Sequence, residues 1–116
     1  MEVIYATGTE SLAVLEILVH YDVLPRDYAL TRIQIPAHVA IEQILTPPPG
    51  WDSLVPNPDA RAEGDKWVRE ARTAVLSVPS RVIRSERNFI INPSHPQFSA
   101  IVFDPPVPYR FDPRLK

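Results

Sequence analysis

One acidic residue stands inside an apolar run near the N-terminus. Glu16 lies within residues 12–19, and every other residue of that stretch is apolar. A carboxylate among apolar side chains costs free energy unless it is paired or has a chemical task. It is therefore either half of a structural ion pair with an arginine or a carboxylate at the edge of a cleft whose partner is a ligand. We expect the second arrangement.

Two further polar residues flank predicted strands. Ser80 follows a strand expected at residues 74–78, where functional groups often lie, but it also suits an ordinary turn or cap. Asn88 begins a strand expected at residues 88–91, in a stretch whose asparagines and prolines favour turns. Since Ser80 has neither a histidine within a few residues nor a Gly-x-Ser-x-Gly motif, the sequence does not support a serine hydrolase.

Several other chemistries are disfavoured by composition. The chain has no cysteine, so disulfides and thiolate metal sites are excluded, and its three histidines lack metal-ligand spacing. No glycine-rich loop predicts a Rossmann or P-loop nucleotide site. The net charge of −2 argues against direct nucleic-acid binding. We therefore expect no metal and no nucleic-acid partner.

Length and hydropathy predict a single domain, residues 1–116, and a cytoplasmic protein that does not bind membranes. The sequence is 45% apolar and 22% charged, as in globular chains, and has no run of about 20 apolar residues that would cross a membrane. No basic stretch precedes the apolar run of residues 12–19, so this run is not a signal peptide.

The elements that must position these side chains indicate an α+β fold with two main helices and short mixed or antiparallel strands. Thr7 and Glu10 have capping-box spacing, which predicts a helix reaching about His20 that is buried because it is apolar nearly all round. Asn57-Pro58 predicts an amphipathic helix ending near Thr73. Strands are expected at residues 3–5, 28–35, 74–78, 88–91 and 100–103, with a short strand or a helical turn at 39–45.

Segments along nearly the whole chain resemble the RES domain, a family of bacterial toxins named for an arginine, a glutamate and a serine. The combination of the apolar helix, the Val-Pro-Ser turn and the Glu-Arg-Asn…Asn-Pro…His-Pro run is specific. The resembling segments are residues 3–6, 10–20, 24–25, 48–52, 64–67, 74–80, 86–96 and 111–115.

The resemblance implies a small ADP-ribosyltransferase-like domain that consumes NAD as its substrate. NAD would be cleaved at the nicotinamide–ribose bond by phosphorolysis, with phosphate as a second ligand, or by ADP-ribosyl transfer. The implied partner is a Xre-type helix-turn-helix antitoxin. The implied catalytic residues are Tyr5, Glu16 and Ser80, and the implied NAD-binding residues are Tyr5, Ser80 and Asn88.

The arginine that helps to name the family lies upstream of the strand that begins here at Val3. Positive charge is available at Arg32, Arg81, Arg84 and Arg87, but none of them occupies the family position. One charge-assisted contact is worth roughly 1.5–3 kcal/mol. Without a contact from the family arginine, we therefore expect NAD turnover to be about ten- to a hundredfold slower than with it. The alternative function is a catalytically impaired RES remnant that binds an antitoxin or itself. We expect self-association, because an uncovered strand edge can pair between chains.

Overall fold

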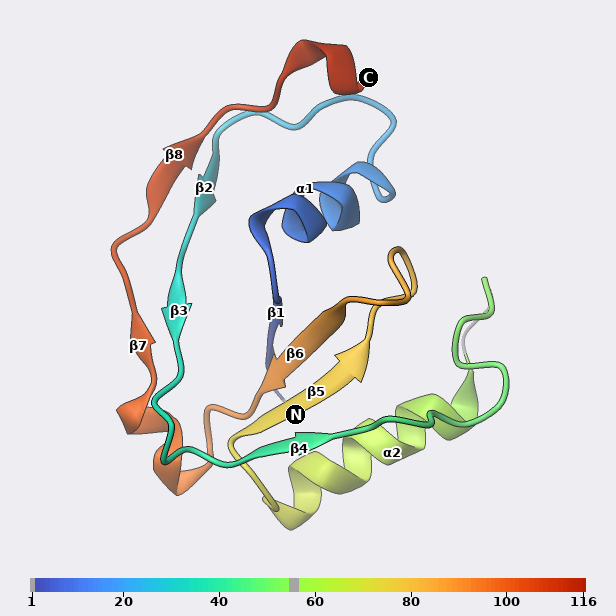
Figure 1. The fold of residues 1–116 in the computed structure, drawn as a ribbon, viewed down its shortest axis with the longest axis vertical. Helices are drawn as coiled ribbons and strands as arrows, with labels where there is room; N and C mark the ends of the chain where they lie inside the picture. Colours follow the sequence, from blue (N-terminus) through green and yellow to red (C-terminus); the bar gives the residue numbers. More distant parts are fainter. Residues whose placement is uncertain (1, 55–56) are drawn as a thin grey trace.

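The computed structural model describes residues 2–54 and 57–116, which form the predicted α+β fold (Figure 1). These residues contain two α-helices and eight short strands, with 3₁₀-helices at Pro96–Ala100 and Pro113–Leu115. No helix in the described residues has both the length and the apolar character that a membrane span requires.

The central element is a four-stranded sheet with the order β1-β6-β5-β4. It consists of β1 (Ile4–Thr7), β6 (Arg87–Ile91), β5 (Val75–Pro79) and β4 (Ile41–Gln43). The β1–β6 and β6–β5 pairs are antiparallel, whereas β4 runs parallel to β5. The stretch predicted as either a strand or a helical turn at residues 39–45 is therefore a short edge strand.

Two small ribbons stand apart from this sheet. β2 (Tyr28–Leu30) pairs with β8 (Val107–Tyr109), and β3 (Ile33–Gln34) pairs with β7 (Val102–Phe103) (Figure 1). The prediction of one continuous strand over residues 28–35 is therefore wrong, and β8 was not predicted. A proline lacks the N–H that a central strand needs, but the edge position of β8 tolerates Pro108.

The first helix, α1 (Glu10–Leu18), is capped by a different threonine from the one predicted. Thr9 is the N-cap, and its hydroxyl accepts a hydrogen bond from the backbone N–H of Leu12 at 3.1 Å. Thr7 is instead the last residue of β1. The helix ends at Leu18, two residues before the predicted end.

The expectation that α1 is buried on all sides is also wrong. Only Leu12 and Leu18 are buried, and the rest of its apolar side chains are half-buried. The physical reason is that α1 turns Ala13, Val14 and Ile17 toward a cavity rather than toward packed protein. Its apolar character therefore reflects a cavity wall as well as a core.

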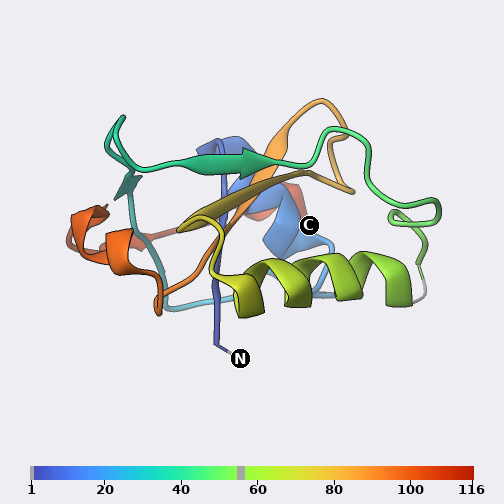
Figure 2. The same ribbon diagram turned by 90° about the horizontal axis from the view of Figure 1, so that it is seen from below.

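The second helix, α2 (Pro58–Glu70), begins as predicted. The Asn57 side chain accepts from the backbone N–H of Ala60 at 2.9 Å, and Pro58 occupies the first turn. The helix ends before the predicted Thr73, because Ala71 adopts a left-handed conformation with φ 49°. Figure 2 shows α2 lying along one face of the sheet, beneath β4 and β5.

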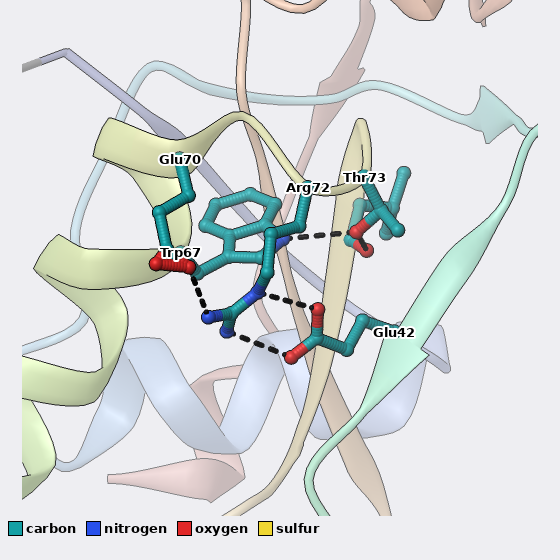
Figure 3. Close-up of polar contacts among 6 residues, drawn as sticks. Glu42, Trp67, Glu70, Arg72 and Thr73 are labelled. Carbon is teal, nitrogen blue, oxygen red and sulfur yellow. Dashed lines mark hydrogen bonds and ion pairs between the residues drawn. The ribbon is translucent and has the colours of Figure 1, made fainter.

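A short segment after α2 joins the helix to the sheet (Figure 3). Arg72 donates to both carboxylate oxygens of Glu42 on β4, at 2.9 and 3.0 Å, and to Glu70 at 2.9 Å. The hydrogen bonds from these two carboxylates, first Glu42 and then Glu70, raise the pKa of the Arg72 guanidinium. All three side chains are partly exposed, so this network fixes geometry more than it adds stability.

Candidate active site

Glu16 is held by two side chains that come from far along the chain. The Ser80 hydroxyl donates to Oε1 of Glu16 at 3.0 Å, and the side-chain amide of Asn88 donates to the same oxygen at 2.9 Å. Within residues 2–54 and 57–116, no arginine, lysine or histidine forms an ion pair with Glu16. The structural ion pair considered as the simpler interpretation is therefore not formed in that part of the chain.

The β5–β6 hairpin brings Ser80 and Asn88 to the same place. Val78 of β5 is the cross-strand partner of Asn88, and Ser80 comes two residues after Val78. Side chains alternate between the faces of a sheet, so Val78, Ser80 and Asn88 share one face. Arg87 points to the other face, where it donates to the hydroxyl and carbonyl of Ser77.

Ser80 also organises the turn that follows β5. Its Oγ accepts from the backbone N–H groups of Val82 at 3.0 Å and Ile83 at 3.1 Å, while its proton goes to Glu16. The side chain is 0% exposed and does not line the cavity described below. The Ser80 hydroxyl therefore has two roles: it stabilises the turn, as an ordinary turn serine would, and it binds Glu16.

Replacing Ser80 by alanine should destabilise the protein. The substitution leaves two backbone donors and one carboxylate oxygen short of a partner in a buried site, and we expect the free energy of unfolding to fall by about 1–3 kcal/mol. Urea unfolding followed by circular dichroism measures this change. Ser85→Ala, a change at an exposed serine, is the control, and equal midpoints for Ser80→Ala and the unsubstituted chain would contradict the expectation.

Asn88 has one side-chain atom without a partner. Its Oδ1 is buried and accepts no hydrogen bond from the described residues, whereas its Nδ2 is bound to Glu16. A buried carbonyl oxygen without a donor costs free energy and calls for an explanation. Asn88 also lines the cavity beside Glu16. A ligand that carries an N–H or O–H group would satisfy this oxygen.

A cavity of about 970 Å³ lies between α1 and β1 on one side and β2, β3 and β8 on the other. Glu16, Asn88 and Tyr5 all line it. Tyr5 is opposite Ile90 in the β1–β6 register, which puts its side chain on the same face as Asn88. Tyr5 is 76% exposed and makes no hydrogen bond with Glu16, Ser80 or Asn88 in the described residues. Of the four predicted site residues, Glu16, Ser80 and Asn88 are joined by hydrogen bonds, and Tyr5 lines the same cavity.

Aromatic residues form one end of this cavity. Tyr28 packs edge-on against Phe111, with ring centroids 6.0 Å apart, and its hydroxyl donates to that of Tyr21 at 2.7 Å. This hydrogen bond, and secondly partial burial, raise the pKa of the Tyr28 hydroxyl. Tyr28 is therefore a neutral hydrogen-bonding group at the cavity wall at ordinary pH.

The structure also separates the four arginines that the sequence left as equal alternatives. Arg84 forms an ion pair with Asp52 at 2.6 Å, Arg81 donates to the carbonyl of Ser53, and Arg87 is bound to Ser77 and to the carbonyl of Ile44. Arg32 lines the cavity. In the described residues no group of three or more His, Cys, Asp or Glu side chains is arranged to hold a metal ion.

Known proteins resemble this chain over nearly its full length. The RES domain matches residues 1–112. A Prs ADP-ribosylating toxin from Sphingobium sp. (strain YBL2) is 34% identical, over 97% of this chain and 74% of the relative. Proteins named toxin Res are 34% identical in Pseudomonas putida, over 82% of this chain and 67% of the relative, and 38% identical in Photorhabdus laumondii, over 82% and 63%. The chain therefore belongs to the RES-domain family.

Proposed function

We propose that this protein is a toxin that degrades NAD at the bond between nicotinamide and ribose. The observation that supports this proposal best is the state of the Glu16 carboxylate. Both hydrogen bonds that it accepts from the described residues go to Oε1, so within that part of the chain Oε2 keeps its lone pairs for a ligand in the cavity that Glu16 lines. The name of the Sphingobium relative, an ADP-ribosylating toxin, points to the same chemistry.

The carboxylate suits the charge that develops in this reaction. When the bond between C1′ of the ribose and the pyridinium nitrogen breaks, its electron pair leaves with nicotinamide, and positive charge gathers on C1′ and the ring oxygen. A fixed anion beside that centre stabilises the cation, or orients the ribose hydroxyls beside it. An oxygen of phosphate, of water or of a protein side chain then forms the new bond to C1′, which gives phosphorolysis, hydrolysis or ADP-ribosyl transfer.

The neighbouring residues have distinct tasks in this proposal. Asn88 offers its unpartnered Oδ1 to the nicotinamide carboxamide or to a ribose hydroxyl. Tyr5, exposed on the cavity wall, offers a ring on which nicotinamide can stack. Ser80 is a positioning residue, because its hydroxyl is buried and already committed to Glu16 and to the turn.

A toxin of this kind needs a partner that restrains it. We propose a Xre-type antitoxin that covers the cavity. The alternative, an impaired family member that serves as a binding or self-associating module, is favoured by one observation: β1 and β4 are the edges of the four-stranded sheet and have no further strand partner in the described residues. Free strand edges pair readily with another chain.

Incubation of the purified protein with NAD tests the proposal. Nicotinamide and the ADP-ribosyl product are separated by liquid chromatography and identified by mass spectrometry, with phosphate present in one arm and absent in the other. We expect nicotinamide release, together with ADP-ribose phosphate in the phosphate arm, free ADP-ribose, or a mass gain on a protein. The incubations extend over hours at high protein concentration, so that slow turnover is also detected.

Expression in bacteria, with and without an antitoxin, distinguishes an enzyme from a binding module. Expression of the protein in bacteria should stop growth and lower cellular NAD, and co-expressed antitoxin should restore both. If neither nicotinamide release nor a fall in cellular NAD is found while the protein still binds an antitoxin or itself, the enzyme proposal is wrong and the alternative stands.

A further inference from the structure

We propose that Arg32 is the cation that binds the phosphate groups of the substrate, so that the cavity has a phosphate subsite on the wall opposite Glu16. This inference rests on the proposed function, because it concerns the same cavity. It assigns a role to a residue that neither the sequence pattern nor the site around Glu16 requires.

The first support is the placement of Arg32 among the cations. The chain has 12 lysines and arginines, and among the described residues that line the cavity Arg32 is the only one of them. In the described residues its guanidinium makes no ion pair and no hydrogen bond, whereas Arg72, Arg84 and Arg114 are each paired with a carboxylate. An unpaired guanidinium at a cavity wall is available to an anion.

The second support is the way the backbone of Arg32 is held. Arg32 lies between β2 and β3, and its carbonyl accepts from the N–H of Asp104 at 2.9 Å. Asp104 lies opposite Arg32 when the β3–β7 register is continued by one residue. Its carboxylate accepts a hydrogen bond from the side-chain amide of Gln34 at 2.7 Å. The main chain at Arg32 is therefore held in place, while its side chain has no partner among the described residues and can bind a ligand.

The third support is the charge pattern of the cavity. Glu16 comes from α1 and Arg32 from the connection between β2 and β3, and both residues line the cavity. Figure 1 shows α1 apart from β2 and β3. NAD has the complementary pattern, a cationic nicotinamide ring at one end and an anionic pyrophosphate in the middle. With the nicotinamide ribose at Glu16 and the phosphates at Arg32, both charges meet their opposites, and the reverse orientation places like charges together.

The chemistry of arginine fits this task. Its planar guanidinium forms paired hydrogen bonds with phosphate oxygens and keeps its charge at any ordinary pH. Without a cation the pyrophosphate would enter a cavity that already contains the carboxylates of Glu10 and Glu16. Arg32 therefore determines affinity for phosphate-bearing ligands, and has no part in breaking the bond at C1′.

Binding measured by titration calorimetry tests this assignment, with NAD and nicotinamide riboside as the two ligands. Nicotinamide riboside shares the nicotinamide ribose of NAD and lacks its phosphates. We expect Arg32→Ala to weaken NAD binding by about tenfold or more and to leave riboside binding unchanged. Added salt should weaken NAD binding to the unsubstituted chain more than to Arg32→Ala. Arg110→Ala, which removes an exposed arginine outside the cavity lining, is the matched control and should bind NAD normally.

The outcomes separate this inference from the proposed function. If Arg32→Ala binds NAD as tightly as the unsubstituted chain, Arg32 is not the phosphate ligand, although the cavity remains the NAD site. If both ligands lose affinity equally in Arg32→Ala, the residue supports the cavity in general and the phosphate subsite is refuted. If the unsubstituted chain binds neither ligand, the proposed function itself fails, and the subsite fails with it.

Discussion

Replacing Glu16 by glutamine should lower the rate of nicotinamide release from NAD by about a hundred- to a thousandfold. The change removes the negative charge that would face the developing cation at C1′. It keeps the size of the side chain and an amide oxygen, which can still accept from Ser80 at 3.0 Å and Asn88 at 2.9 Å. The loss should therefore appear in the rate and not in the melting temperature. Nicotinamide release under saturating NAD, followed by chromatography, measures it.

A second acid in the same cavity provides the matched control. Glu10 lines the cavity, but it is exposed in the first turn of α1 and has no contact with Ser80 or Asn88 in the described residues. Glu10→Gln should change the rate by less than about threefold, since its charge is screened by solvent. A Glu16→Gln variant that retains the full rate would show that the carboxylate has no role in the chemistry.

Replacing Trp67 by alanine should have the largest effect on stability. Trp67 is the largest side chain with no exposed surface, and its indole N–H donates to the hydroxyl of Thr73 at 2.9 Å. Removing a buried tryptophan costs about 3–5 kcal/mol of unfolding free energy, which corresponds to a fall in melting temperature on the order of 10–20 °C. Thermal unfolding followed by circular dichroism measures the shift.

Two variants separate the contribution of the hydrogen bond to Thr73 from the contribution of burying the indole ring. Thr73→Val removes the hydrogen-bond acceptor and keeps the shape, so its cost should be only about 1–2 kcal/mol. Trp51→Ala, a change at a half-buried tryptophan in the loop after β4, should cost less than Trp67→Ala. Equal losses for Trp51→Ala and Trp67→Ala would contradict the expectation that the fully buried tryptophan costs more to remove.

The sequence could predict those elements whose signals are local. Asn57-Pro58 marks the first turn of α2, and that start is confirmed because the cap needs only residues three positions apart. The α+β class is confirmed for the same reason, since each strand and helix has its own pattern. The capping-box spacing of Thr7 and Glu10 favoured Thr7 as the cap of α1, whereas Thr9 is the cap because β1 continues to Thr7.

The contacts that depend on distant residues could not be predicted in this way. Glu16 lies 64 positions from Ser80 and 72 from Asn88, and nothing local indicates that both donate to one carboxylate oxygen. The resemblance to the RES domain named all three residues, but it did not indicate that the Ser80 hydroxyl is buried away from the cavity. It also left Arg32 as one of four arginines, because pairing of the other three depends on side chains in separate segments. The catalytic and binding roles of Tyr5, Glu16, Ser80 and Asn88 stay predictions.

The pairing of the two ribbons has a consequence for the order of events during synthesis. Tyr28 pairs with Tyr109 and Ile33 with Phe103, so the wall that carries Arg32 is closed by strands roughly 70 to 80 positions further along the chain. Such long-range pairs form late, because the loop between them must close first. While residues 102–109 are still missing from the growing chain, the cavity lined by Glu16 and Arg32 lacks the strands that close one of its walls. The wall that carries Arg32 is therefore complete only after β7 and β8 have been synthesised and have paired with β3 and β2.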